Sequence, residues 1–571
     1  MRTPVLLALG LTLVGLTACA PDSVPPAAPA SATGPEDTAS KADLVARAGA
    51  PLFDGMGDYH RTITTADPSA QRYFDQGMVL AFGFNHAEAI RSFRAAQRLD
   101  DRCAMCYWGE ALATGPNINV TAKGKAIMSP ADQVAAYAAL QKAEELRQYA
   151  NDVERDLIDA LVVRYSPTPV ENRDPFDRAY ADALGTLTRR YPADDDIAAM
   201  YAEAWMNTMP WNYWSDAGTP RPEIVPVLAA LEASIARNPR HPLTLHLYIH
   251  AMEASSNASR AEDEADTLLN LVPGSGHLVH MPAHLYWRVG RYHDAAEANV
   301  RAAAVDEAYI TACNAQGFYP ALYYPHNIHF LWAASSMEGR SAVAIDAARR
   351  LAANVRLEQI EQFPTVEFFH TVPLLALVQF GKWRELLEEP APRADLAYST
   401  AIWHYARGTA FAKTGEIAAA RAELAALIPL KANDKVLSLD GGDFPASTLL
   451  DIADALLSGE IALASEDLPA AITEFERAVA VQDSLPYTEP PFWYYPTRQS
   501  LGVALLRADR AADAEQVYRK DLEQYPHNGW STYGLIQSLE AQDKNDEAAE
   551  HRGHFAMMWS LADVELSASR L

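Results

Sequence analysis

A helical repeat of about 34 residues recurs along most of this chain, and it limits the fold more than any other feature of the sequence. In the first clear repeat, Gly77 and Ala89 allow two helices to approach closely, and Phe93 fills the gap between them. Four later segments have matching spacing, marked by Gly290, Gly408, Gly459 and Gly502. Apolar residues follow the helical period without sustained two-residue alternation, so we expect an all-α chain of stacked helix pairs.

This pattern resembles the tetratricopeptide superfamily over most of residues 70–555. The resemblance implies an α-solenoid, a right-handed superhelix of helix pairs whose first helices line a concave groove. Three loops are longer than the repeat allows, at 115–129, 209–223 and 432–444. In the second loop, we expect the aromatic side chains to form either the loop's own small core or a shelf for a ligand; they are Trp211, Tyr213 and Trp214.

Three short motifs carry a closer resemblance. The segments CAMCYWGEA (103–111), GHLVHMPAH (276–284) and YPHNIHF (324–330) are similar to those of a family of bacterial tetratricopeptide lipoproteins with no assigned activity. The resemblance implies the fold and does not assign a function.

The first 19 residues resemble a bacterial lipoprotein signal peptide. Arg2 gives a positive start, and the apolar run Val5–Leu16 is too short to cross a bilayer but suits a signal-peptide core. The run ends in Leu-Thr-Ala-Cys, so we expect Cys19 to carry the lipid that is the protein's membrane anchor. Ala20 after it favours the outer membrane, facing the periplasm. The alternative is a simple signal peptide that is cleaved after Ala18 or Ala20.

The rest of the chain divides by composition and repeat content. Residues 20–42 are rich in Pro and Ala and predict a flexible tether, so the folded part is expected to begin near Asp43. We expect N-terminal helical repeats over 43–240, His-rich repeats over 241–390 and C-terminal repeats over 391–571.

Histidines are concentrated in the middle of the chain, where nine of the 16 lie between His241 and His329. Aligned by repeat, most of them fall one turn apart on the helix face that lines the groove. Adjacent first helices lie roughly 10 Å apart, so their imidazoles can share an ion, and imidazole and carboxylate suit Cu, Zn or Fe. We therefore predict a transition-metal site on side chains exposed in the groove, with His277 on the same face; the candidate ligands are His246, His250, Glu253, His280, His284, His326 and His329.

Upstream repeats place acids and thiols on the same face. Glu110 and Glu203 are candidate acidic groove residues. Cys103 and Cys106 are consistent with a local disulfide, which an oxidising periplasm favours, or with a metal site or a redox pair. We expect Cys313 to be a buried free thiol.

Three further histidines have structural interpretations. His370 and His404 fall at core-facing repeat positions, and His241 precedes a proline and is expected to cap a helix.

Several classes of function are excluded by charge and motif. The net charge of −27 argues against a nucleic-acid partner. The sequence has no Walker loop, GxGxxG or GxSxG, so we expect no nucleotide. Tyr107 follows the Cys-x-x-Cys where covalent haem needs His, and the pair His246 and His250 lacks the Glu of a zinc protease.

Two functions remain. The first is an envelope lipoprotein whose groove binds a transition metal, with an enzymatic form in which Glu253, Glu203 or Glu110 ligates the ion or acts as general base. The alternative is a metal-free scaffold that holds a peptide or protein segment in the groove.

Overall fold

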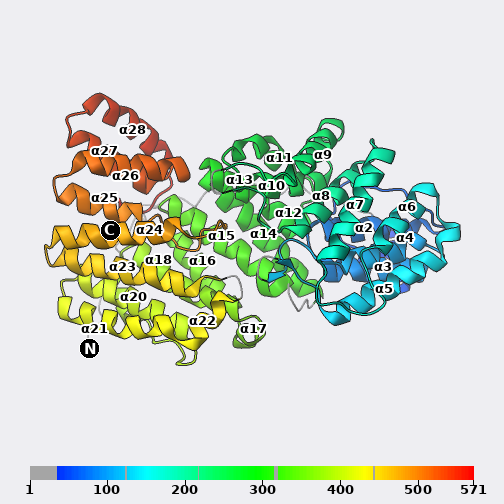
Figure 1. Cartoon of the computed structure of the whole chain (residues 1–571), viewed down its shortest axis with the longest axis horizontal. Helices are drawn as coiled ribbons and strands as arrows, with labels where there is room; N and C mark the ends of the chain where they lie inside the picture. Colours follow the sequence, from blue (N-terminus) through cyan, green and yellow to red (C-terminus); the bar gives the residue numbers. More distant parts are fainter. Residues whose placement is uncertain (1–34, 123–124, 216–217, 314–318, 442–443) are drawn as a thin grey trace, which may run out of the picture.

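The computed structural model describes residues 35–122, 125–215, 218–313, 319–441 and 444–571, and regular structure in these ranges is almost entirely helical (Figure 1). The N-terminal helices are α1 (Pro35–Ala48), α2 (Pro68–Phe82), α3 (His86–Leu99), α4 (Ala104–Ala113), α5 (Pro130–Glu145), α6 (Asp152–Val162), α7 (Asp174–Arg190), α8 (Asp195–Thr208) and α9 (Ile224–Arg237). The central helices are α10 (Pro242–Met252), α11 (Glu262–Leu268), α12 (Gly276–His280), α13 (Pro282–Val289), α14 (Tyr292–Cys313), α15 (Tyr324–Met337), α16 (Ser341–Asn354), α17 (Leu357–Gln362), α18 (Val372–Gln379) and α19 (Trp383–Glu388).

The C-terminal helices are α20 (Ala397–Lys413), α21 (Ile417–Leu427), α22 (Asp434–Asp440), α23 (Ala446–Ala464), α24 (Leu468–Asp483), α25 (Arg498–Arg507), α26 (Ala511–Gln524), α27 (Gly529–Glu540) and α28 (Asn545–Met558). Short 3-10 or π turns lie between them, at η1 (Arg147–Tyr149), η2 (Ala258–Ala261), η3 (Tyr319–Tyr323), η4 (Pro364–Thr371) and η5 (Ile428–Ala432). A two-stranded antiparallel hairpin joins β1 (Thr121–Ala122) to β2 (Lys125–Ala126).

Consecutive helices pack as antiparallel neighbours because glycines of one helix receive an aromatic ring of the next. Phe93 of α3 lies against Gly77 of α2 and Gly109 of α4, where an added Cβ would lie 2.7 and 2.5 Å from the ring. Tyr518 of α26 lies in the same way between Gly502 and Gly534, where an added Cβ would lie 2.2 Å from Tyr518 Cζ at either glycine. The predicted all-α fold of stacked helix pairs is therefore confirmed.

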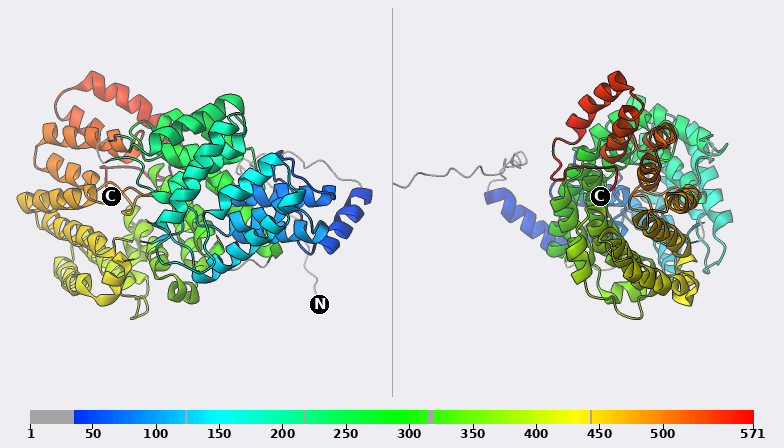
Figure 2. Two further views of the ribbon diagram at one scale, coloured as in Figure 1. Left: turned by 45° about the vertical axis from the view of Figure 1, so that its right-hand side comes forward. Right: turned by 90° about the vertical axis from the view of Figure 1, so that its left-hand side faces the viewer.

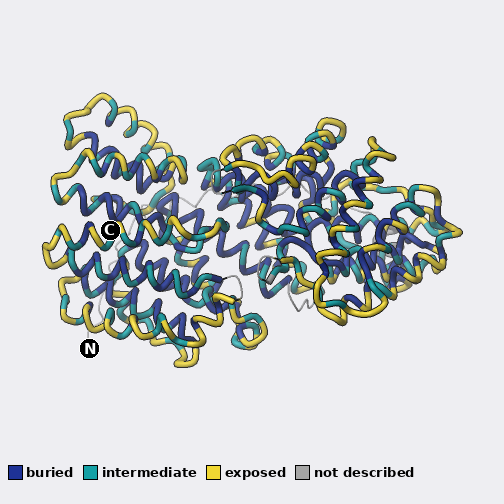
Figure 3. The backbone as a smooth tube through the Cα atoms, viewed as in Figure 1, coloured by how far each residue is buried: buried dark blue, intermediate teal, exposed yellow. Residues whose placement is uncertain are grey.

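The solenoid curves so that its last helices return to its middle (Figure 2). The indole Nε1 of Trp530 in α27 donates to the Ser336 carbonyl at 2.8 Å. The Asp563 carboxylate accepts from the backbone N–H groups of Ser341 and Ala342 at 2.7 and 2.9 Å. The buried residues lie along the inside of the helical layers, as Figure 3 shows.

The structure differs from the sequence-based segmentation in three places. The predicted loop 432–444 contains α22, and 115–129 contains the β1–β2 hairpin. Helix α1 begins at Pro35, inside the segment predicted as a tether. The signal peptide and Cys19 lie outside the described residues. No helix in the described part of the chain is long and apolar enough to span a membrane.

Candidate metal centre

Four helices of the central repeats bring six histidines together. His246 and His250 lie one turn apart on α10, and Pro242 at the first turn of α10 suits the start of a helix. His277 and His280 belong to α12, His284 belongs to α13, and His326 lies near the start of α15. The repeat alignment placed these six histidines on one helix face, and the structure brings them together.

The first trio is His246, His250 and His277, whose ligand nitrogens all lie within 4.8 Å of one another. His246 Nδ1–H donates to the Phe82 carbonyl at 2.6 Å, and His250 Nδ1–H donates to Glu253 Oε1 at 2.8 Å. These bonds leave a lone pair on each Nε2, and neither Nε2 has a hydrogen-bond partner. Both ring nitrogens of His277 are also buried without a partner.

The second trio is His280, His284 and His326, again with ligand nitrogens within 4.8 Å of one another. His280 Nδ1–H donates to Asn299 Oδ1 at 2.7 Å, and Asn299 is held by its own bond to the Ala295 carbonyl. The Nε2 atoms of His280 and His284 face each other at 2.9 Å. Two nitrogens bound to one ion at about 2.0–2.1 Å and roughly 90° would have this separation.

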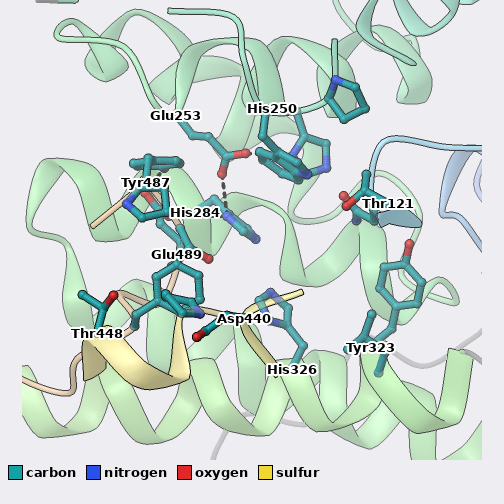
Figure 4. Close-up of a pocket in the computed structure, with 18 of the residues that line it drawn as sticks. Thr121, His250, Glu253, His284, Tyr323, His326, Asp440, Thr448, Tyr487 and Glu489 are labelled. Carbon is teal, nitrogen blue, oxygen red and sulfur yellow. Dashed lines mark hydrogen bonds and ion pairs between the residues drawn. The ribbon is translucent and has the colours of Figure 1, made fainter. Parts of the chain in front are cut away.

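Glu253, at the end of α10, joins the two trios (Figure 4). One of its oxygens accepts from His250, and the other lies 2.5 Å from His284 Nδ1. Burial alone would raise the pKa of Glu253. The charge of His284, together with the hydrogen bonds that Glu253 makes with His250 and His284, lowers the pKa to about 2. Burial would lower the pKa of His284, but Glu253 raises it to about 10. In the metal-free protein His284 Nε2–H therefore donates to His280 Nε2, and an ion bound by the second trio must displace that proton. Glu489 Oε2 lies 3.4 Å from His284 Nδ1.

The remaining histidines of the trios are held neutral, the form that binds a metal. Burial is the largest cause and lowers the pKa of each of them, and neighbouring imidazoles add to the effect; they are His246, His250, His277, His280 and His326.

Five of the six trio histidines are buried and His326 is half-buried, which corrects the prediction that they are exposed in a groove. Phe84, in the turn between α2 and α3, lies against all three rings of the first trio, with centroid distances of 4.7 to 6.1 Å. Trp211 meets His250 edge-on at 5.1 Å. Phe330 lies 4.8 Å from His284. The segment 485–497, between α24 and α25, covers the second trio and supplies Glu489.

A chamber of about 800 Å³ opens beside the centre (Figure 4). His250, His277, His284 and His326 form one of its walls. The other walls come from the hairpin region, the loop after α8, η3, α22, the start of α23 and segment 485–497.

Other predicted site residues lie elsewhere. His329 is outside both trios, where its ring stacks on Trp332 at 5.2 Å and packs against Phe368 and Phe369. Glu110 accepts from Arg94 and Gln97, and so does not face the histidines. Burial raises the pKa of Glu203 to about 7, but Glu203 belongs to none of the ligand groups found among the described residues.

The cysteines and the structural histidines follow most of the predictions. Cys103 and Cys106 are joined as a disulfide at the start of α4, so they offer no thiolate to a metal. Cys313 is free but only half-buried. His241 caps α10 by accepting from the Thr244 N–H. His404 and His370 have partners outside the trios, namely Glu423 and the Val355 carbonyl.

Sequence reasoning missed two members of the site. His277 shares the predicted face but was not among the candidate ligands. Glu489 lies more than 200 residues from Glu253 in the sequence, and only the return of segment 485–497 brings it there. No spacing within one repeat signals that approach.

Comparisons with known proteins do not assign the repeats to a particular family. No protein-family model matches the chain, and no curated protein matches it. Among solved structures, it is similar to the Cut9 complex with Hcn1 (12% identity, covering 92% of this chain and 78% of the other, TM-score 0.31) and to human IFIT1 with a capped RNA (12%, 91% and 99%, 0.32). It is also similar to yeast Tom70 (14%, 87% and 92%, 0.26). At such identities and TM-scores, these likenesses carry no argument about what the chain binds.

Proposed function

We propose that this protein binds transition-metal ions in the two histidine trios. The supporting observation is the direction of the ring nitrogens. His246, His250 and His280 each donate from Nδ1 to a fixed acceptor, so each presents the Nε2 lone pair inward. Metal-ligating histidines in proteins have this arrangement, because an acceptor on the far nitrogen fixes the tautomer and orients the ring.

The unpartnered nitrogens support the same proposal. Buried polar atoms without partners cost roughly 1–3 kcal/mol each, and the first trio has four of them. An ion bound between the rings would satisfy three of these atoms, one nitrogen from each residue. The aromatic residues around the rings would exclude water from part of the site, which strengthens the bonds between a cation and its ligands.

The ligand chemistry defines the class of ion. Six imidazoles with carboxylates behind them suit Cu, Zn or Fe, whereas Mg and Ca prefer oxygen ligands. Glu253 faces two Nδ1 atoms, so we assign it the role of orienting His250 and His284 rather than binding the ion.

The test is metal analysis of protein purified without a His tag, before and after reconstitution with Zn, Cu or Fe. We expect stoichiometric metal that is lost when His250 and His284 are both changed to Ala. Wild-type protein that holds no such metal after reconstitution would refute the metal centre and leave the metal-free peptide scaffold as the function to test.

A matched pair of variants distinguishes a loss of histidine orientation from a general loss of protein stability. Glu253→Ala removes the acceptors of two trio histidines, and we expect about a 10- to 100-fold loss of metal affinity. Glu423→Ala removes the acceptor of His404, a histidine outside the trios, and should leave the affinity unchanged. Equal losses in both variants would contradict the assigned role of Glu253.

We further propose that the protein is an envelope lipoprotein anchored through Cys19, which the motif Leu16–Cys19 supports. Cys19→Ser should move the protein from the membrane fraction to the soluble fraction, because the full chain has a net charge of −27 and anionic headgroups repel an acidic protein. A variant that still sediments with membranes in moderate salt would contradict the anchor.

A further inference from the structure

The chamber beside the trios is lined by aromatic side chains that supply no ligand to the proposed metal centre and have no role in the membrane anchor. Its residues other than the trio histidines include four aromatic side chains, which are Trp211, Tyr323, Tyr487 and Phe492. Its volume of about 800 Å³ falls in the range of sites for small organic molecules, roughly 300–1,000 Å³. The chamber therefore has room for a ligand in contact with the histidine wall.

The aromatic wall is fixed in place. Trp211 has a backbone φ of 63°, a left-handed conformation that is rare for a bulky residue and tends to persist at functional sites. Its indole Nε1 donates to the Ile118 carbonyl at 2.9 Å, which sets the ring beside His250. Tyr487 also lines the chamber, where Arg288 lies over its ring and its hydroxyl donates to Glu489. Flat rings held in this way favour a flat ligand.

The charges of the chamber exclude one large class of ligands. Among its described lining residues there is no Lys or Arg, and the cationic His284 is paired with Glu253 and Glu489. Asp440 adds a third carboxylate. Sites for phosphate or carboxylate groups use Arg, Lys or clustered backbone N–H groups. A ligand here would therefore carry no anionic group apart from an atom that binds the metal.

We infer that the chamber receives a small hydroxyaromatic molecule, of the phenol or catechol class, whose oxygen binds the metal held by the trios. The inference rests on the proposed metal centre. The ring of the ligand would lie against the side chains of Trp211 and Tyr487, and its oxygen would face the wall of His250, His284 and His326. Hydroxyl groups elsewhere on the ligand would meet Thr121, Ser447 or Thr448.

The experiment titrates zinc-reconstituted full-length protein with 4-nitrocatechol, whose absorption shifts when its oxygens bind a metal. We expect saturable binding, and we expect catechol-3,5-disulfonate, which keeps both metal-binding oxygens and adds two anionic groups, to bind at least tenfold more weakly. Metal content measured after the titration identifies any extraction of zinc by the probe. Equal affinity for the two compounds, or no binding of 4-nitrocatechol to protein that retains its zinc, would overturn the inference.

Variants of the aromatic wall test the placement of the ring. Trp211→Ala should weaken 4-nitrocatechol binding about tenfold, the order expected for the loss of one stacked aromatic pair. The titration is made at full zinc occupancy, because the variant also removes part of the cover over His250. Trp214→Ala is the matched control, because Trp214 lies in the neighbouring cavity on the other side of segment 485–497 and does not line the chamber. Equal weakening by both variants, or none by Trp211→Ala, would contradict the placement.

A second variant keeps the test decisive if Trp211→Ala fails to fold. Thr448→Trp, at the start of α23, would fill the chamber on the wall away from the histidines. It should block 4-nitrocatechol and retain zinc, and should still allow azide, which is small enough to reach the metal. Wild-type protein that binds no zinc would contradict the proposed metal centre. Wild-type protein that binds zinc but not 4-nitrocatechol would contradict only the ligand proposed here.

Discussion

At the scale of single residues, the centre is defined by which ring nitrogens have partners. The sequence predicted the helix face for His246, His250, His280, His284 and His326, because i, i+4 spacing depends only on the helical period. It wrongly placed His329 with them: η4 supplies Phe368 and Phe369, and their rings hold the His329 imidazole away from the trios. Repeat position alone does not specify what a neighbouring segment packs against.

His277 gives the sharpest single-residue test, because its two ring nitrogens have no partners. His277→Phe keeps a flat ring of similar shape and removes two buried polar atoms. We expect the metal content of the first trio to fall, while the free energy of unfolding of the metal-free protein stays the same or rises by up to about 2 kcal/mol.

The control for that variant is His280→Phe, which breaks the bond to Asn299 and the contact with His284. It should lower the free energy of unfolding of the metal-free protein by about 1–3 kcal/mol. Urea unfolding of both variants without metal makes the comparison, and a His277→Phe protein less stable than His280→Phe would contradict the assignment of partners.

The buried neutral histidines also predict how stability depends on pH. In the unfolded chain a histidine takes up a proton near pH 6.5, but burial lowers the pKa of the trio histidines other than His284 in the folded protein. Below pH 6.5 the unfolded state therefore binds more protons, and stability falls as the pH falls, by up to about 1.4 kcal/mol per pH unit for each group.

The pair of Glu253 and His284 does not offset this loss. The contribution of Glu253, whose pKa is lowered to about 2, is present above about pH 4.5 and is lost only below it. The contribution of His284, whose pKa is raised to about 10, is already complete at pH 6.5. The Tm of metal-free protein should thus drop between pH 6.5 and 5.5, and less steeply in His277→Phe. A Tm that is constant over this range would contradict the buried, neutral state.

At the scale of elements, the sequence predicted the helix pairs well because their contacts are local. Gly77 and Phe93, or Gly502 and Tyr518, are separated by one helical hairpin, so the small and large residues recur at a fixed spacing. The cover of the trios was not predictable in this way. The α2–α3 turn with Phe84 and the segment with Glu489 come from repeats far from α10 in the sequence.

The close contacts between helices can be tested with two glycines in neighbouring helices. In Gly534→Ala the new Cβ would lie 2.2 Å from Tyr518 Cζ, so α26 and α27 must separate, at a cost of about 1–3 kcal/mol. In Gly553→Ala, within α28, no atom lies within 4 Å of the new Cβ, and the better helix propensity should stabilise the protein by about 0.5–1 kcal/mol. Thermal unfolding followed by circular dichroism distinguishes the two; a loss of stability in both would contradict the packing.

At the scale of the whole molecule, curvature converts a line of repeats into a closed arrangement around the centre. The sequence predicted a stack in which each repeat contacts its neighbours. It did not predict that Trp530 and Asp563 would return to Ser336 and Ser341, nor that segment 485–497 would lie over α13. These contacts depend on the summed rotation of many repeats, and no single repeat specifies that sum.

This closure predicts where bound metal should stabilise the molecule. An ion in the first trio would link α10 to α12, and an ion in the second would link α12, α13 and α15. Segment 485–497 would be held through Glu489. An ion present at about 1,000 times its Kd stabilises the state that binds it by about 4 kcal/mol. Amide exchange that requires the trios to open should therefore slow by up to about 1,000-fold in these elements, while exchange in α5 and α21, which supply no ligand, should stay the same.

Hydrogen exchange followed by mass spectrometry, with and without zinc, measures this pattern directly. Protection confined to segment 485–497 and the four ligand-bearing helices would show that one centre connects repeats far apart in the chain. Zinc that binds stoichiometrically but protects α5 and α21 equally, or protects no part of α10, would place the ion elsewhere. In that case the buried histidines would have to be explained by packing alone, even though the unpartnered nitrogens of His277 make packing alone unfavourable.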